Sequence, residues 1–159
     1  CLTVSSMTSV PTMFQIIKWR RNTTNLDVFG SDPDIALYLE IKDVRNLTYN
    51  PETLSADHNQ NVITEVIRYG MADSVTLSNV LDTIRKWRDR DAVLYYSKFL
   101  TKSKSPIYIS IHEGDGSGKG QYVDGYYRAN RPMYDYHDLI DNRLTIVECT
   151  SDYIKAISN

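Results

Sequence analysis

The chain has 159 residues, of which 42% are hydrophobic and 24% are charged, so we expect a single globular domain rather than a disordered chain. The formal net charge is −2, which disfavours nucleic acid as a partner because phosphate-binding chains are usually basic. No apolar run approaches the roughly 20 residues of a membrane span, so direct membrane insertion is not expected.

The N-terminal end differs in composition from the rest of the chain. Residues 1–12 are small, polar and rich in Ser and Thr, so we expect a loose arm on a single domain that covers residues 1–159. The first residue is Cys1 rather than Met, which suggests a piece released from a larger protein. Two unpaired thiols are favoured over a disulfide between Cys1 and Cys149, but the pairing stays open.

Apolar residues alternate along much of the first half of the chain. This alternation predicts strands over residues 13–20 and 35–43, with a loop at 21–33 between them. Residues 47–59 are rich in turn-forming residues. Residues 62–69 fit a helix or a strand, and their β-branched side chains favour the strand.

The clearest helical pattern lies in the middle of the chain, at residues 77–88. Thr76 or Ser78 can cap this helix. Its apolar stripe has the i, i+3, i+4, i+7 spacing and consists of Leu77, Val80, Leu81, Ile84 and Trp87.

The second half of the chain returns to a period of two. We expect strands at 92–100, 106–112, 121–128 and 144–149, a polar loop at 134–142 and a short helix at 151–157. The strands at 106–112 and 121–128 would form a hairpin around the glycine-rich turn 114–120.

These elements together predict an α+β fold. Strands do not alternate with helices in this interpretation, which disfavours a doubly wound sheet. We expect an antiparallel, curved sheet wrapped around the main amphipathic helix at 77–88.

The sequence offers no clear catalytic or metal motif. Asp34, Glu40 and Lys42 resemble the pattern of a metal-dependent nuclease, but on one strand they would form a solvated face. The glycine-rich segment 114–120 fails the phosphate-loop spacing at both ends. We therefore expect no catalytic residue, no metal ligand and no cofactor, and a protein that is not an enzyme.

A cluster of aromatic and polar residues at 122–138 is the best candidate for a binding site. Aromatic platforms with Asp, Asn and Arg hydrogen-bonding groups suit sugars, and the same mixture suits protein recognition. The alternative is a Tyr-rich hairpin that packs on its own sheet. The candidate glycan-binding residues are Tyr126, Tyr127, Arg128, Asn130, Tyr134, Tyr136 and His137.

The segment Cys149-Thr-Ser-Asp-Tyr-Ile154 resembles the end of the rotavirus spike-protein head, a protease-released domain of similar size. The expected helix at 77–88 does not fit the galectin-like fold of the best-known heads, so the resemblance points to a divergent, group-B-like head. It implies an outer-capsid attachment domain at the virion surface. Its partners would be host cell-surface glycans with galactose-containing, blood-group-type cores, and the rest of the spike protein. The alternatives are a viral or pathogen protein-interaction domain and a metal-dependent nuclease.

Overall fold

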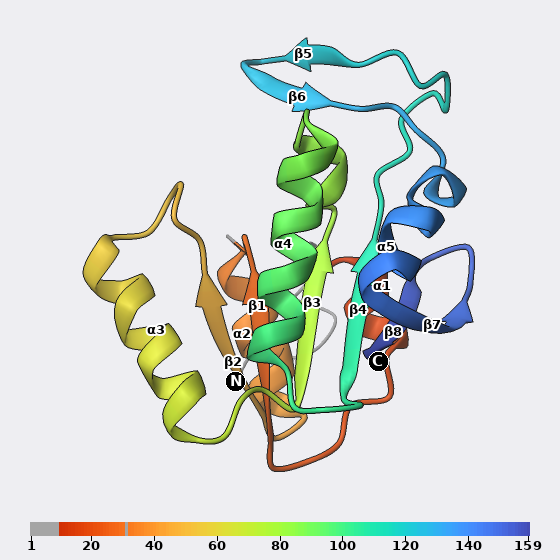
Figure 1. The fold of residues 1–159 in the computed structure, drawn as a ribbon. Coiled ribbons are helices and arrows are strands. Elements are labelled where there is room, and N and C mark those ends of the chain that lie inside the picture. The colour runs from red at the N-terminus through yellow and green to blue at the C-terminus, as the bar shows by residue number, and fades with distance from the viewer. Residues whose placement is uncertain (1–9, 31) are drawn as a thin grey trace.

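The computed structural model describes residues 10–30 and 32–159, and its centre is a six-stranded sheet with the order β2-β1-β3-β4-β8-β7 (Figure 1). Neighbouring strands among β1 to β4 pair in parallel, whereas β8 runs antiparallel between β4 and β7. A separate antiparallel hairpin, β5–β6, lies beyond the upper edge of the sheet in this view. The strands are β1 (Thr23–Val28), β2 (Val44–Tyr49), β3 (Ser74–Ser78), β4 (Pro106–Ser110), β5 (Gln121–Val123), β6 (Tyr126–Arg128), β7 (Leu144–Cys149) and β8 (Ile154–Ser158).

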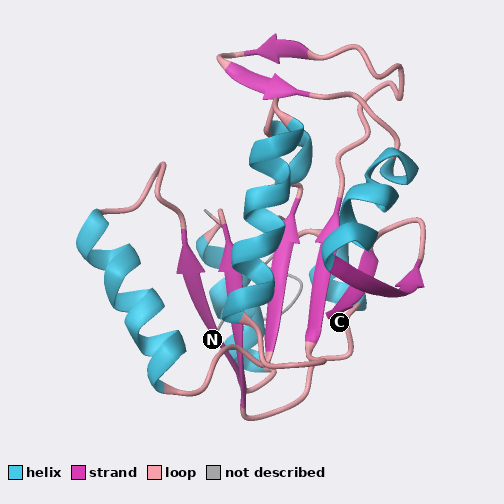
Figure 2. Cartoon of the chain, viewed as in Figure 1, coloured by secondary structure: helices cyan, strands magenta, loops and turns pink. Residues whose placement is uncertain are grey.

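Helices cover both faces of the sheet (Figure 2). One apolar core joins one face to α3, α4 and α5, and a second joins the opposite face to α1 and α2. None of the helices in the described ranges is long and apolar enough to cross a membrane. The helices are α1 (Thr12–Ile16), α2 (Pro33–Ile41), α3 (Ala56–Arg68), α4 (Trp87–Leu100) and α5 (His137–Arg143), with short 3-10 turns η2 (Leu81–Thr83) and η3 (Met133–Tyr136).

The predicted α+β fold with an antiparallel sheet around one helix is therefore wrong. The sheet is mostly parallel, and strands and helices alternate through the first half of the chain. The predicted helix at 77–88 does not exist as one element, because Leu77 belongs to β3 and Trp87 begins α4. Asn79 has a φ of 52°, which interrupts any regular helix between them.

Four predicted strands are helices instead. The first part of residues 13–20 belongs to α1, residues 35–43 belong mostly to α2, residues 62–69 belong to α3 except for the last one, and residues 92–100 lie in α4. The alternating apolar residues of α2 are only half buried, since Ile35 and Leu39 are in the core while Leu37 and Ile41 are exposed. Asp32 caps this helix by accepting a hydrogen bond from the Asp34 N–H, and Pro33 occupies its first turn.

Two strands of the sheet, the edge strand β2 and its neighbour β1, were missed because their sequences are polar. β1 reads Thr-Thr-Asn-Leu-Asp-Val and lies in the predicted loop 21–33. β2 reads Val-Arg-Asn-Leu-Thr-Tyr and ends in the segment predicted to be turn-rich. Buried parallel strands are usually continuous apolar runs, so neither strand gives the expected signal.

The predictions for the second half of the chain agree better with the structure. The strands at 106–112 and 144–149 are confirmed as β4 and β7. The segment 121–128 forms a hairpin by itself and does not pair with β4, and the predicted helix at 151–157 is the strand β8. The predicted loop 134–142 holds η3 and most of α5.

The N-terminal predictions are tested only in part. Residues 1–9 of the expected loose arm, including Cys1, lie outside the described residues. Val10 is buried and Thr12 begins α1, so the end of that segment is part of the fold. Cys149 is a free and exposed thiol.

Candidate functional site

The carboxyl ends of β1 to β4 lie along one edge of the sheet, below the β5–β6 hairpin in Figure 1. From β1 the chain passes through α2 to β2 on one side, and then through α3 to β3 on the other side. The strand order therefore reverses between β1 and β3. In open α/β sheets, ligands bind outside the carboxyl ends of the strands at such a reversal.

A line of buried polar side chains leads to this edge. Ser74 donates a hydrogen bond to Asn25, Asn25 donates to Thr76, and Thr76 Oγ1 donates to Asp27 Oδ1 over 2.8 Å. Asp27 is 1% exposed, and burial raises the pKa of its carboxyl group to about 7. Its protonation state therefore changes near neutral pH, at the end of β1.

The turn after β1 is tied to the turn after β2. The Phe29 N–H donates to the Tyr49 carbonyl over 2.6 Å, and the two rings meet edge to face. Phe29 has a φ of 61°, which is strained for a bulky residue. The Asn50 side chain donates to the Gly30 carbonyl and accepts from the Glu52 N–H, so both turns are held in one arrangement.

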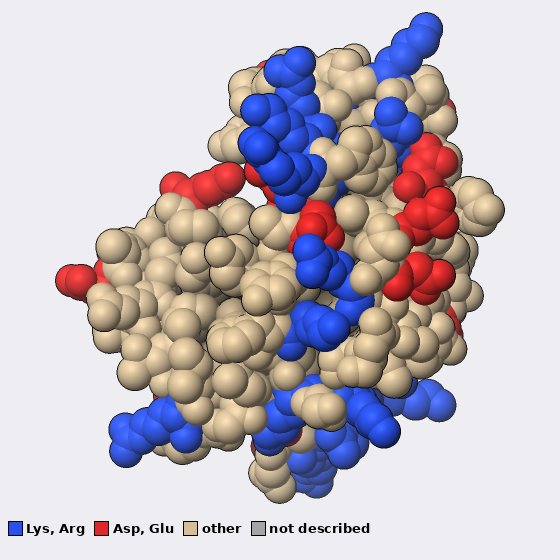
Figure 3. All heavy atoms as spheres, in the orientation of Figure 1, with Lys and Arg blue, Asp and Glu red and all other residues tan. Residues whose placement is uncertain are grey.

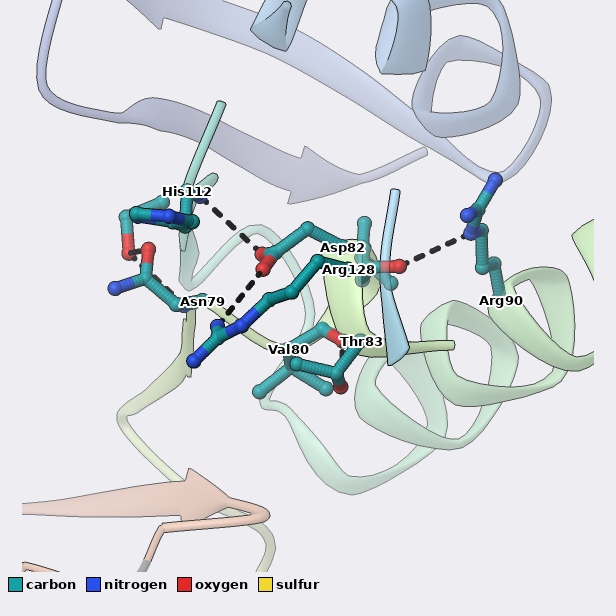
Figure 4. A network of polar contacts seen from close by, with 9 residues as sticks. Asn79, Val80, Asp82, Thr83, Arg90, His112 and Arg128 are labelled. Atoms are coloured by element: carbon teal, nitrogen blue, oxygen red, sulfur yellow. Dashed lines mark hydrogen bonds and ion pairs between the residues drawn. The ribbon is translucent and has the colours of Figure 1, made fainter. Parts of the chain in front are cut away.

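A buried carboxylate follows β3. Asp82 is fully buried, and its Oδ1 accepts a hydrogen bond of 3.3 Å from the His112 N–H (Figure 4). Its Oδ2 has no hydrogen-bond partner, and the nearest cation is Arg128 Nη1 at 3.9 Å. Burial raises the pKa of this carboxyl group. A buried carboxylate oxygen that accepts no hydrogen bond is costly and is a common feature of functional sites.

The turn that contains Asp82 is stabilised by a second buried charge, Arg90. Arg90 donates through Nε to the carbonyl groups of Leu81 and Ile84, at 3.0 and 2.7 Å. Its guanidinium lies over the Trp87 ring at 4.2 Å and near the Tyr136 ring at 5.3 Å. Arg90 therefore fixes the 3-10 turn that carries Asp82 to the start of α4.

The structure separates the seven residues predicted to bind glycans. Tyr126, Tyr127 and Arg128 lie on β6, whereas Tyr134 is exposed on η3. Asn130 is buried and donates to the Lys119 carbonyl, Tyr136 is completely buried, and His137 begins α5 near the Cys149 thiol. What these side chains bind stays a prediction, but they do not form one exposed surface.

The nuclease alternative fails on its geometry. Asp34 and Glu40 lie on the helix α2 and Lys42 is its C-cap, so none of them is on a strand. Within residues 10–30 and 32–159 there is no group of three or more His, Cys, Asp or Glu side chains that could hold a metal ion.

The edge residues Asp27, Gly30 and Asp82 were missed by the sequence analysis. The signal that could have found them is Asp27-Val-Phe-Gly30 followed by the capping pair Asp32-Pro33, which is a strand, a turn and a helix start in succession. It was hidden because β1 itself is polar. Arg128 is one of the predicted glycan-binding residues, but that prediction did not include its ion pair with Asp82.

The comparisons with solved structures identify the fold. The chain superposes on the pyocyanin biosynthetic protein PhzM with a TM-score of 0.65 at 10% identity, covering 91% of this chain and 52% of that one. It superposes on the 1,6-didemethyltoxoflavin-N1-methyltransferase of Burkholderia thailandensis with a TM-score of 0.62 at 15% identity, covering 87% and 72%. It superposes on a TehB-like SAM-dependent methyltransferase of Corynebacterium glutamicum with a TM-score of 0.60 at 14% identity, covering 98% of this chain and 92% of that one.

The chain shares its fold with these solved methyltransferase structures. No protein-family model and no curated protein matches the sequence. The chain spans about half the length of PhzM. This likeness overturns the rotavirus spike-head resemblance, along with the attachment function, the non-enzymatic assignment and the glycan and spike partners that it implied.

Proposed function

We propose that this chain is a SAM-dependent methyltransferase that acts on a small molecule. The observation that carries the proposal is the parallel sheet with its reversal between β1 and β3, in the strand arrangement shared with methyltransferase structures. One of these was solved with bound S-adenosylhomocysteine and a small-molecule acceptor. SAM supplies an activated methyl group on a positively charged sulfur.

The residues at the edge suit such a cofactor. Asp82 Oδ2 is a buried acceptor without a hydrogen-bond partner, which fits an ammonium group. Glu52 follows β2 and is exposed, in the position where an acidic side chain binds ribose hydroxyls in related nucleotide-binding sheets. The aromatic rings of Phe29 and Tyr49 offer an apolar surface beside the turn.

One feature departs from the usual nucleotide-binding turn. Gly30 is flanked by Phe29 and leads to Pro33, so the turn from 28 to 33 has a single glycine. The N-terminus of α2 is also capped by the Asp32 carboxylate, which disfavours a ligand anion there. A cationic ligand matches these surroundings better than a phosphate does.

The first experiment is a calorimetric titration with SAM and with S-adenosylhomocysteine. We expect both to bind, and Asp82→Asn to weaken binding about tenfold or more, because a hydrogen bond to a charged group is worth roughly 1.5–3 kcal/mol. Asp115→Asn is the matched control, since Asp115 lies exposed in the glycine-rich turn. Transfer of a labelled methyl group to a panel of small aromatic and heterocyclic acceptors then tests the reaction. Folded protein that binds neither compound at millimolar concentration would refute the proposal.

A further inference from the structure

The Oδ2 atom of Asp82 is closed off from solvent by a side chain of the β5–β6 hairpin. This oxygen is buried and accepts no hydrogen bond, and the Arg128 side chain comes from β6 to end 3.9 Å from it (Figure 4). The Arg128 side chain is 39% exposed whereas Asp82 is fully buried, so the guanidinium lies between the carboxylate and solvent. A ligand cation therefore reaches this oxygen only if Arg128 moves away.

The contact between Arg128 and Asp82 leaves the carboxylate incompletely satisfied. A distance of 3.9 Å is too long for a hydrogen bond, so Oδ2 has a positive charge nearby but no donor. A primary ammonium group carries three N–H donors around one compact charge and can make a direct, charge-assisted hydrogen bond to such an oxygen. An ammonium group is thus a better partner for Asp82 than Arg128 is, and such a difference shifts a conformational equilibrium.

The hairpin that carries Arg128 is held on the domain by few contacts. Its two strands have three residues each, and most of their side chains are exposed or half-buried, so it buries little apolar surface of its own. The Ala129 N–H donates to the Asp82 carbonyl, and the Gly118 N–H donates to the Asn130 carbonyl over 2.7 Å. These two bonds close the base of the hairpin and give a fixed pivot, beyond which β5 and β6 can tilt together.

Positive side chains gather where the hairpin meets the domain. Figure 3 shows Lys and Arg over the hairpin and the start of α4, and Arg85, Lys86 and Arg88 are exposed in that segment. Within the described part of the chain, Asp82 is the one carboxylate that forms an ion pair with Arg128. When a ligand cation neutralises Asp82, Arg128 loses this counter-charge, and its positive neighbours favour its departure.

We propose that Arg128 is a gate on the cofactor site: it occupies the position of the ligand's ammonium group, and the ammonium group displaces it from Asp82 and releases the β5–β6 hairpin. The displaced position is assigned to the ammonium group of the cofactor, so the gate rests on the proposed function. The free protein is then the closed form, and the hairpin opens when the cofactor binds.

Amide hydrogen exchange of the full wild-type chain tests the displacement. We expect S-adenosylhomocysteine, which carries the ammonium group, to accelerate exchange in β5 and β6 several-fold. 5′-Methylthioadenosine lacks the amino-acid part of the cofactor and should leave this exchange unchanged. Methylammonium chloride should accelerate it relative to sodium chloride at equal ionic strength, and this comparison does not depend on cofactor binding.

Calorimetric titration of two variants tests the competition. Arg128→Met should bind S-adenosylhomocysteine several-fold more tightly than the wild type does, because no cation has to be displaced, and should bind 5′-methylthioadenosine equally well. Arg85→Met is the matched control. It removes an exposed positive charge from the same surface that forms no ion pair with Asp82, so both affinities should stay close to those of the wild type.

The gate and the proposed function fail in different ways. If S-adenosylhomocysteine binds and leaves hairpin exchange unchanged, the gate is overturned and the proposed function stands. Weaker binding to Arg128→Met also overturns the gate, because Arg128 would then hold the ligand rather than compete with it. If neither adenosyl compound binds folded protein, the proposed function fails. The methylammonium comparison then decides: faster exchange supports displacement of Arg128 by an ammonium group, and unchanged exchange overturns it.

Discussion

At the scale of single residues, Asp27 is the most unusual ionisable group at the sheet edge. Its carboxyl group accepts from Thr76 but is otherwise enclosed, and burial raises its pKa from 3.8 to about 7. The folded state therefore holds a proton on Asp27 at pH values where the unfolded chain has lost it. Stability from this group is full below pH 3.8 and is lost as the pH rises through about 7.

Asp27→Asn should remove this pH dependence. The amide keeps an acceptor for Thr76 and carries no charge, so the variant should be more stable than the wild type at pH 8 and closer to it at pH 5. The shift corresponds to roughly 4 kcal/mol at most. Urea unfolding at both pH values measures the difference. If the unfolding free energies of the two proteins changed equally between pH 5 and pH 8, Asp27 would not be buried as described.

The Asp27 carboxyl group leaves no room for a side chain at Gly30. A Cβ at this position would lie 1.9 Å from Asp27 Oδ2 and 2.6 Å from its Cγ, and Asp27 is too short and too enclosed to move aside freely. Gly30→Ala should therefore destabilise the fold by about 1–3 kcal/mol. Chemical denaturation checks this, and the cost should shrink in the Asp27→Ala background, which removes the obstacle. An equal cost in both backgrounds would contradict the contact.

At the scale of elements, the β5–β6 hairpin is attached to the domain through Asp82. The Ala129 N–H donates to the Asp82 carbonyl over 3.0 Å, and Arg128 on β6 pairs with the Asp82 carboxylate. The hairpin forms its own two-stranded sheet, and such a pair is marginally stable alone. Its position over the carboxyl edge therefore depends on these contacts.

Arg128→Met should loosen the hairpin. It leaves a fully buried carboxylate without its cation, so we expect a loss of about 1–3 kcal/mol. Because burial raises the pKa of Asp82, this loss should become smaller as the pH falls. Amide hydrogen exchange of β5 and β6 should accelerate in the variant. Arg21→Met, which breaks the exposed pair with Asp43, is the control and should have little effect on either measurement. Unchanged exchange in Arg128→Met would mean that the pair does not hold the hairpin.

At the scale of the whole molecule, the sequence predicts the later strands better than the central sheet. β4 and β7 have apolar residues at alternating positions and were found, whereas β1 and β2 carry buried or half-buried Asn, Asp and Thr and were not. The polar side chains of β1 are satisfied by partners 49 to 51 residues away, on β3. That pairing decides that β1 is a strand, and it is invisible to local periodicity.

The candidate site could not be predicted from local periodicity for the same reason. Asp82 lies within the predicted helix 77–88, which does not form, because Leu77, Leu81 and Trp87 match a helical stripe by coincidence across β3, η2 and α4. Once the strands alternate with helices, the reversal between β1 and β3 follows and locates the site. Because the predicted function depended on the predicted fold class, the wrong fold class led to a wrong function.

The place of β8 in the sheet has a consequence for biosynthesis. β8 enters between β4 and β7, with Ile154 and Ala156 fully buried, although it is the last strand of the chain. While the ribosome still holds residues 154–158, β4 and β7 each lack a neighbour and expose an open edge. The nascent protein therefore cannot complete its sheet until residues 154–158 have left the ribosome, and an interrupted translation product that lacks these five residues would be prone to aggregate.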